Sequence, residues 1–274
     1  MNSTRRSGLN STALALIPLA IAINIVIGQL VTGLPVYLDS IGTVLVGALL
    51  GPWMGLLTGV LSNVIWTLLG NPVPIWFAYV AGVIGLMAGF AGRLGVFQRP
   101  SPRWLSAIIG GIFLFGLTLF ILMFVNRNPD PTAFPPFPNA AQLIQDNLII
   151  FIIATLIGLA AGYFVLKNAG YAGLAGLITG IVAAIISAPM AAWYFGGVTG
   201  SGTDALVAAF RASGAGILDS TLAQGTVSDP FDKMTSFMLV WLIIQAMPQR
   251  LLERFPNTRA TEDLQPLGNP VTNG

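Results

Sequence analysis

The sequence is poor in charged side chains, and this shortage decides the broad class of the protein. Only 8% of its 274 residues are charged, whereas 55% are hydrophobic. A water-soluble domain carries about 25% charged residues. The chain therefore lacks the charge to cover a surface in water, and its long apolar runs predict a protein that lies in a lipid bilayer.

Cysteine and histidine are both absent. Without cysteine the chain has no disulfide and no thiol nucleophile. Without histidine it lacks the commonest general base and the commonest metal ligand. The sequence also has no Gly-x-x-x-x-Gly-Lys-Ser/Thr motif for ATP hydrolysis. We therefore expect no enzyme activity, no metal site and no cofactor, and the small net charge of +2 gives no indication of nucleic-acid binding.

The apolar segments predict an all-α fold, a polytopic membrane bundle of six to eight transmembrane helices. Residues 1–255 form this single domain, and the polar residues 256–274 are expected to be a disordered cytoplasmic tail. The second segment is short, and Gly51-Pro52-Trp53 predicts that it turns tightly into the third. The predicted spans cover residues 12–33, 37–51, 53–69, 75–95, 105–125, 147–166, 172–195 and 233–250.

The basic residues predict that both termini are cytoplasmic, because short cytoplasmic loops are rich in Lys and Arg. With the N-terminus inside, three basic residues fall outside, namely Arg127, Arg211 and Lys233. The others fall inside: Arg5, Arg6, Arg93, Arg99, Arg103, Lys167, Arg250, Arg254 and Arg259.

Two long external loops separate the later spans. Prolines in residues 126–146 predict an irregular loop. Residues 203–214 predict a short helix capped by Thr203, which lies at the outer interface, closes over a cavity, or simply connects two spans. In residues 228–234, Asp229 and Pro230 predict the first turn of the last helix. On this interpretation no charged residue lies in the middle of a span, which argues against a proton-coupled transporter.

Small residues recur every four positions and predict close helix packing, either within the chain or against a partner subunit. The segment "GLLTGVLSNVI" (55–65) is also similar to "GLITGIVAAII" (176–186), which suggests a duplicated unit. The small-residue stripes comprise Gly47, Gly51, Gly55 and Gly59; Gly85 and Gly89; Ala154, Gly158 and Gly162; and Gly176 and Gly180.

Polar and aromatic residues near the outer ends of the spans predict an outward-facing cup that binds a small ligand. Asn63 and Trp66 are three residues apart and so share one helix face. The same residues also fit an interfacial aromatic belt, an Asn63 amide that pairs helices, and an Asp39 that starts the second span. The candidate substrate-binding residues are Tyr37, Asp39, Thr43, Asn63, Trp66, Asn71, Trp76, Tyr79 and Trp193.

The segment "LPVYLDSIGTVLVGALLGPWMGLLTGVLSNVIWTLLGNP" (34–72) resembles the substrate-binding S components of energy-coupling-factor transporters. The resemblance rests on Leu34-Pro35, Asp39, Gly51-Pro52, Gly55 with Gly59, and Asn63. The ending "SDPFDKMTSFMLVWLIIQAMPQRLLERF" (228–255) also resembles some members. Family members typically have six spans and an Ala-x-x-x-Ala docking motif in the first, whereas this chain has eight predicted spans and only Ser11 with Ala15.

The resemblance implies a multi-pass protein of the bacterial cell (inner) membrane that captures a vitamin or related micronutrient at the outer face. Its implied partners are a transmembrane coupling subunit and two ATPases, which would explain the missing nucleotide-binding motif. Two other functions remain open. One is a ligand-sensing receptor module, although no signalling domain follows the spans. The other is a self-sufficient secondary transporter, which the predicted absence of buried charge disfavours.

Overall fold

The computed structural model describes residues 11–128 and 138–258, and within these ranges all regular secondary structure is helical. The prediction of an all-α fold is therefore confirmed. The helices are α1 (Ser11–Leu30), α2 (Ile41–Leu50), α3 (Pro52–Leu68), the 3₁₀ turn η1 (Pro74–Phe77), α4 (Ala78–Arg93), α5 (Arg103–Val125), α6 (Ala140–Asp146), α7 (Leu148–Phe164), α8 (Gly170–Trp193), α9 (Asp204–Ala212), α10 (Ile217–Ala246) and α11 (Gln249–Leu252).

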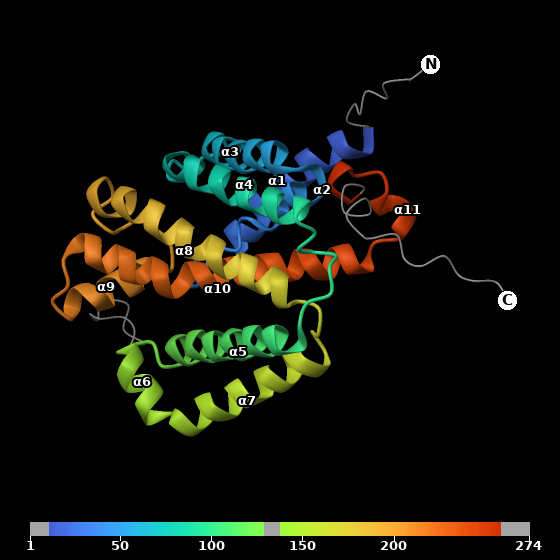
Figure 1. The fold of residues 1–274 in the computed structure, drawn as a ribbon. Coiled ribbons are helices and arrows are strands. Elements are labelled where there is room, and N and C mark those ends of the chain that lie inside the picture. Colours follow the sequence, from blue (N-terminus) through green and yellow to red (C-terminus); the bar gives the residue numbers. More distant parts are fainter. Residues whose placement is uncertain (1–10, 129–137, 259–274) are drawn as a thin grey trace, which may run out of the picture.

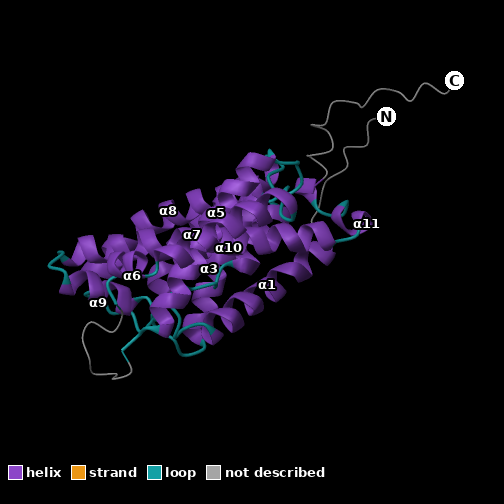
Figure 2. Cartoon of the chain, turned by 90° about the horizontal axis from the view of Figure 1, so that it is seen from below, coloured by secondary structure: helices purple, strands orange, loops and turns teal. Residues whose placement is uncertain are grey.

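The helices form three groups that lie along one another (Figure 1). Helices α1 to α4 form one group, α8 and α10 the middle one, and α5 to α7 the third. Helix α11 lies at the end of the molecule where both ends of the chain emerge, and α6 and α9 lie at the opposite end, as Figure 2 also shows. The molecule therefore has a terminal end and a distal end, and these names are kept below.

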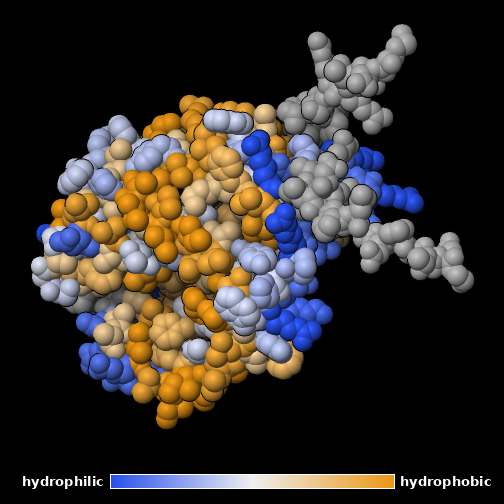
Figure 3. Space-filling model, in the orientation of Figure 1, coloured by the Kyte–Doolittle hydropathy of each residue, from blue (hydrophilic) through white to orange (hydrophobic). Residues whose placement is uncertain are grey.

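The surface between these two ends is strongly apolar, as expected for a membrane protein. Hydrophobic side chains cover much of the middle of the face in Figure 3, and hydrophilic side chains gather toward the ends. Ile149 and Phe164 on α7 are each 73% exposed, and Leu68 on α3 is 80% exposed. Such contiguous exposure of large apolar side chains is stable when lipid, not water, surrounds them.

The structure does not confirm eight spans. In the part of the chain that the structure describes, three helical segments are long and apolar enough to cross a membrane: Pro74–Arg93, Arg103–Val125 and Gly170–Trp193. A fourth is possible if α6 and α7, which meet at an 88° bend, count as one span. Helix α2 has 10 residues, which at about 1.5 Å per residue cover only half of a hydrocarbon core of about 30 Å.

The last predicted span, 233–250, is wrong at its start. Helix α10 begins at Ile217 and ends at Ala246, so Asp229 and Pro230 lie inside it and not at its first turn. The helix continues through Pro230 because it packs along α8, where Gly180 approaches closely: a Cβ on Gly180 would lie 2.4 Å from the Asp229 carbonyl oxygen. The packing of the two helices outweighs the one backbone hydrogen bond that proline removes.

One loop prediction and one tail prediction also change. Part of the 126–146 loop is helical, because the Asn139 side chain accepts a hydrogen bond from the Ala141 amide at 2.9 Å and so caps α6. Residues 256–258, predicted to begin the disordered tail, are packed: Asn257 is 6% exposed and donates to the Ala48 carbonyl at 3.1 Å. The remaining tail, 259–274, and loop residues 129–137 lie outside the described residues.

The small-residue stripes pack helices within the chain. A Cβ on Gly59 of α3 would lie 2.2 Å from the Ala81 carbonyl oxygen of α4, and one on Gly110 of α5 would lie 2.2 Å from the Gly158 carbonyl oxygen of α7. Gly176 of α8 meets the backbone of α10 in the same way. The two similar segments, 55–65 and 176–186, thus use the same glycine spacing, each against one neighbouring helix. Gly51, with φ of 101°, makes the predicted turn before Pro52.

We predict that Gly85→Ala lowers the thermal stability of the detergent-purified protein. A Cβ at Gly85 would lie 2.1 Å from the Gly55 carbonyl oxygen, and overpacking of this kind costs about 1–3 kcal/mol or more. Gly33→Ala is the matched control, because nothing lies within 4 Å of a Cβ there. Since alanine favours helices over glycine by about 1 kcal/mol, an unchanged or raised melting temperature for Gly85→Ala would contradict the close α3–α4 packing.

Candidate functional site

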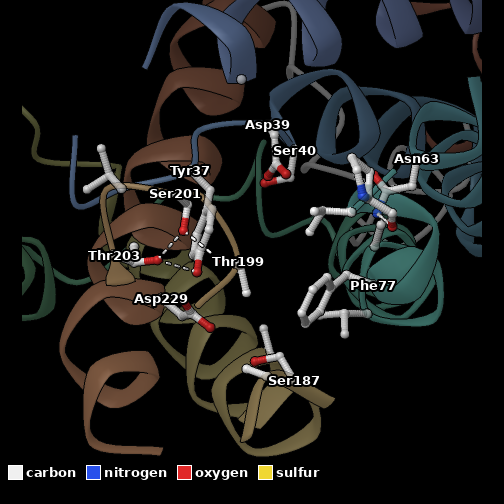
Figure 4. Close-up of a pocket in the computed structure, with 18 of the residues that line it drawn as sticks. Tyr37, Asp39, Ser40, Asn63, Phe77, Ser187, Thr199, Ser201, Thr203 and Asp229 are labelled. Carbon is white, nitrogen blue, oxygen red and sulfur yellow. Dashed lines mark hydrogen bonds between the residues drawn. The ribbon is translucent and has the colours of Figure 1, made fainter. Parts of the chain in front are cut away.

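A cavity of about 160 Å³ opens among helices α1, α2, α3, α4, α8 and α10, with η1 and the loop before α9 completing its wall. None of the described residues between Ile84 and Ala183 lines it, so α5, α6 and α7 take no part. In Figure 4, Tyr37, Ser201, Thr203 and Asp229 lie on one side of this space, and Asn63 and Phe77 lie on the other. The predicted α9 is present, and its Asp204 and Val207 border the cavity.

Six of the nine predicted site residues line this cavity. They are Tyr37, Asp39, Thr43, Asn63, Trp66 and Asn71. The other three do not. Trp76 packs on Tyr194 with ring centroids 4.1 Å apart, Tyr79 donates to the Ile186 carbonyl at 2.9 Å, and Trp193 is 73% exposed at the end of α8. An interfacial aromatic belt therefore suits Trp193, and the structure does not place these three in the predicted cup.

Thr43 is held by an asparagine that the sequence analysis missed. Asn24 of α1 is 1% exposed and donates to Thr43 Oγ1 at 2.8 Å and to Ser62 Oγ at 2.9 Å. Its Oδ1 accepts the Gly42 amide at 2.7 Å. The Asn24 amide therefore joins α1, α2 and α3. A buried amide that loses such partners costs about 1–3 kcal/mol. These bonds thus fix the part of the cavity wall that carries Thr43.

Asn63 positions the turn that carries Phe77. Its Nδ2 donates to the Pro74 carbonyl at 2.9 Å, and Asn71 Oδ1 accepts the Val73 amide at 3.2 Å. These bonds hold η1 across the distal end of α3. Trp66 fills the space beside Gly28, where a Cβ would lie 2.5 Å from the indole ring. The result is a wall with both an aromatic surface and amide groups, which suits a flat ligand that has polar atoms at its edge.

A buried ionic cluster joins the α1–α2 loop to the middle of α10. Lys233 Nζ pairs with Asp232 Oδ2 at 2.5 Å and with Asp39 Oδ1 at 3.6 Å, and it donates to Ser40 Oγ at 3.1 Å. Asp232 Oδ1 accepts the amide of Leu38, whose φ is positive at 47°. Lys233 is 3% exposed and Asp232 is fully buried. Helix α10 therefore carries buried charge in its middle, although it is not among the helical segments long and apolar enough to cross a membrane, and those segments have no charged residue in their interior.

Asp229 adds a third carboxylate, one helical turn before Lys233. It is 5% exposed, lines the cavity, and accepts a hydrogen bond from Ser228 Oγ at 3.1 Å. Ser228 in turn accepts from Gln224 Nε2 at 2.6 Å. Within the described ranges no basic group lies within 4 Å of the Asp229 carboxylate. Its unfilled acceptor capacity therefore faces the cavity.

A chain of hydroxyls closes the same side of the cavity. Tyr37 Oη lies 2.7 Å from Thr203 Oγ1, which lies 2.6 Å from Ser201 Oγ (Figure 4). Thr203 makes no capping hydrogen bond to α9, contrary to the prediction, because its hydroxyl is used here. Tyr37 lies in the α1–α2 loop, where burial and the nearby Asp229 raise the pKa of its phenol above the ordinary value of about 10. The phenol is therefore neutral and able to donate.

The missed residues of α10 do carry a sequence signal. Thr221, Gln224, Ser228 and Asp232 recur at intervals of three and four, which places them on one face of a helix. Asp229 and Pro230 obscured this pattern, because together they also fit a helix start. A polar stripe that continues on both sides of a proline would have indicated one long helix with a buried polar face.

The chain is similar in sequence to a known vitamin transporter. Biotin transporter BioY of Rhodobacter capsulatus is 30% identical to the chain over 138 residues, which cover 50% of this chain and 59% of the transporter. No family model and no solved structure matches. The chain thus matches somewhat more than half the length of its curated relative. The predicted resemblance to a membrane component of vitamin transport, and not to an enzyme, is confirmed by this similarity.

We predict that Lys233→Met strongly destabilises the protein, because it leaves Asp232 buried without its cation. Breaking a buried ion pair on one side costs about 3–5 kcal/mol. Adding Asp232→Asn to Lys233→Met is expected to recover part of the loss, since the unpaired charge is then removed. Thermal unfolding in detergent measures both, with the exposed Lys167→Met as control. Equal melting temperatures for Lys233→Met and the wild type would contradict a buried ionic cluster.

Proposed function

We propose that this chain is the substrate-binding subunit of an energy-coupling-factor importer of the bacterial cell membrane, and that biotin or a close relative is its substrate. The observation that carries the proposal is the cavity at the distal end, which combines an apolar wall with the polar groups of Asp229, Asn63 and Tyr37. The similarity to a biotin transporter supports the choice of substrate. Six of the nine residues of the cup predicted from sequence, from Tyr37 to Asn71, line this cavity.

The chemistry of biotin suits such a cavity. Its ureido ring presents two N–H donors and one carbonyl acceptor, and its sulfur-containing ring is apolar. The Asp229 carboxylate accepts the donors, and an amide N–H donor suits the carbonyl. Phe77 and Trp66 provide flat surfaces for the fused rings. A ligand that brings N–H donors to Asp229 satisfies a buried carboxylate that the described protein groups leave partly unfilled.

Uptake requires energy that this chain does not supply by a nucleotide-binding motif of its own. We therefore propose that a transmembrane coupling subunit and two ATPases complete the importer, with the termini of this chain in the cytoplasm and its cavity facing outward. The basic helix ends agree with this sidedness: Arg93 ends α4 and Arg103 begins α5, both at the terminal end (Figure 1). A receptor module remains without a supporting observation.

A self-sufficient secondary transporter is the second candidate. The sequence disfavours this function because it predicts no charged residue inside a span, but Asp229, Asp232 and Lys233 are buried in the middle of α10, which removes that objection. The two candidates differ in what they need: the importer depends on ATP hydrolysis by its partners, whereas the secondary transporter depends on an ion gradient alone.

We predict that the purified protein binds biotin and that Asp229→Asn weakens binding by about tenfold or more. A hydrogen bond to a charged group contributes about 1.5–3 kcal/mol, and 1.4 kcal/mol corresponds to about tenfold in Kd. Isothermal titration in detergent measures the affinity. Asp219→Asn is the matched control, since Asp219 is an exposed carboxylate on the same helix. No binding by the wild type would overturn the proposed substrate, and an unchanged Kd for Asp229→Asn would remove that residue from the site.

We predict that the purified chain alone, in liposomes, does not accumulate biotin in response to a proton or sodium gradient. Accumulation is expected when the liposomes also contain the coupling subunit and the ATPase pair, with ATP on the cytoplasmic side. Radiolabelled biotin inside the vesicles is the measurement, and empty liposomes give the background. Gradient-driven accumulation by the isolated chain would favour the secondary transporter instead.

A further inference from the structure

Four contacts between oxygen atoms link Tyr37 to Asp204. Tyr37 Oη lies 2.7 Å from Thr203 Oγ1, Thr203 Oγ1 lies 2.6 Å from Ser201 Oγ, Ser201 Oγ lies 2.9 Å from Thr199 Oγ1, and Thr199 Oγ1 lies 2.7 Å from Asp204 Oδ1. All four distances suit O–H···O hydrogen bonds. The links run from the wall of the cavity to the first residue of α9.

The number of hydroxyl hydrogens fixes the donor-to-acceptor direction of this series of hydrogen bonds, called the hydroxyl chain below. Each hydroxyl has one hydrogen, so the four hydroxyls have four hydrogens for four contacts. An ionised carboxylate accepts only, so Thr199 donates to Asp204. Ser201 must then donate toward Thr199, and Thr203 toward Ser201. The last contact receives its hydrogen from Tyr37, because any other assignment leaves two oxygens facing each other with no hydrogen between them.

Two backbone amides hold Asp204 in this role. The Thr199 and Gly200 amides donate to its Oδ2 at 2.8 Å and 2.6 Å. Ser201 Oγ also lies 3.4 Å from Asp204 Oδ1. This contact likewise favours a Ser201 hydrogen that points toward Asp204, in the same direction as the series of hydroxyl hydrogen bonds. The carboxylate thus has donors on both oxygens, and its Oδ1 is the fixed end at which the hydroxyl chain stops.

We infer that Tyr37 offers the ligand only the lone pairs of its oxygen, and that Asp204 is the positioning residue that imposes this. The inference rests on the proposed function, since it concerns the same cavity. The Tyr37 hydrogen is used by Thr203, and the neighbouring Asp229 is also an acceptor. This side of the site therefore selects a ligand edge that carries N–H or O–H donors, and it disfavours one that presents carbonyl or carboxylate oxygens.

Asp204→Asn is expected to reverse the chain. The two backbone amides keep the side-chain oxygen of the new amide at the Oδ2 position, so its NH₂ group takes the Oδ1 position and donates to Thr199. With this extra donor, five hydrogens serve four contacts, so Tyr37 is no longer required to donate, and the chain can run from Thr199 through Ser201 and Thr203 to Tyr37. The O–H of Tyr37 then points into the cavity. There it faces a donor group of the ligand, which is repulsive, or it donates to Asp229, which takes up an acceptor that the ligand would use.

Biotin is the probe for a double-mutant cycle by isothermal titration. We expect Asp204→Asn and Tyr37→Phe each to weaken binding by about fivefold to tenfold, as for the loss of one hydrogen bond. Asp204 borders the cavity, but both of its oxygens already accept donors from the protein, so we expect it to act through Tyr37. The double variant is therefore expected to be no weaker than Tyr37→Phe alone. Asp146→Asn, an exposed carboxylate on α6 away from the cavity, is the matched control and should leave the Kd unchanged. Additive losses in the double variant would overturn the inference.

A second measurement needs no ligand. The Raman doublet of tyrosine differs between a phenol that donates a hydrogen bond and one that accepts it, and subtracting the Tyr37→Phe spectrum isolates Tyr37. The expected signal is that of a donor in the wild type and of an acceptor in Asp204→Asn. An acceptor signal in the wild type, or the same signal in both proteins, would overturn the inference. If the wild type fails to bind biotin, the proposed substrate falls and this spectrum still decides the direction of the chain.

Discussion

The burial of the Lys233 ammonium is the constraint on which the rest of the structure depends. Moving an unpaired ion from water into a medium of low polarity costs many kcal/mol of free energy. The partners of Lys233 must therefore be in place whenever α10 is packed in the bundle. Asp232 is adjacent in the chain, but Asp39 and Ser40 come from the loop before α2. Because Ser40 is 193 residues away in sequence, the cluster ties the first third of the chain to α10. It also places Tyr37 and the start of α2 beside the cavity.

Close helix packing makes such burial possible. Gly176 and Gly180 let the backbone of α8 approach the backbone of α10 directly at Lys233 and Asp229. Gly59 and Gly85 do the same between α3 and α4, where the aromatic wall of the cavity begins. The cavity is therefore a gap between two tightly packed helix pairs, held open on one side by the ionic cluster. Helices α5 and α7 pack on each other through Gly110 and Gly158 and contribute nothing to its lining.

The sequence alone predicts the all-α fold and six of the residues that line the cavity, and the reason is locality. Asn63 and Trp66 share a face within one helix, and Asp39 lies a few residues from Thr43, so short-range periodicity finds them. The residues it misses depend on distant partners. Asn24 has its role because it donates to Thr43 of α2 and Ser62 of α3. Lys233 has its role because it donates to Ser40, which is distant in sequence. Asp229 and Pro230 fit a helix start equally well in isolation, and only the packing of α8 against α10 decides that the helix continues.

Buried charge inside a membrane bundle does not by itself require proton transport. Asp232 and Lys233 neutralise each other and hold a loop, which is a structural task. Asp204 is the first residue of α9 and so does not lie in the middle of a helix. Its carboxylate accepts hydrogen bonds from two backbone amides and the Thr199 hydroxyl. Asp229 differs, because among the described residues only Ser228 donates to it. A carboxylate that is 5% exposed and so sparsely bonded is costly to bury. Under the proposed function, a ligand with N–H donors would offset that cost.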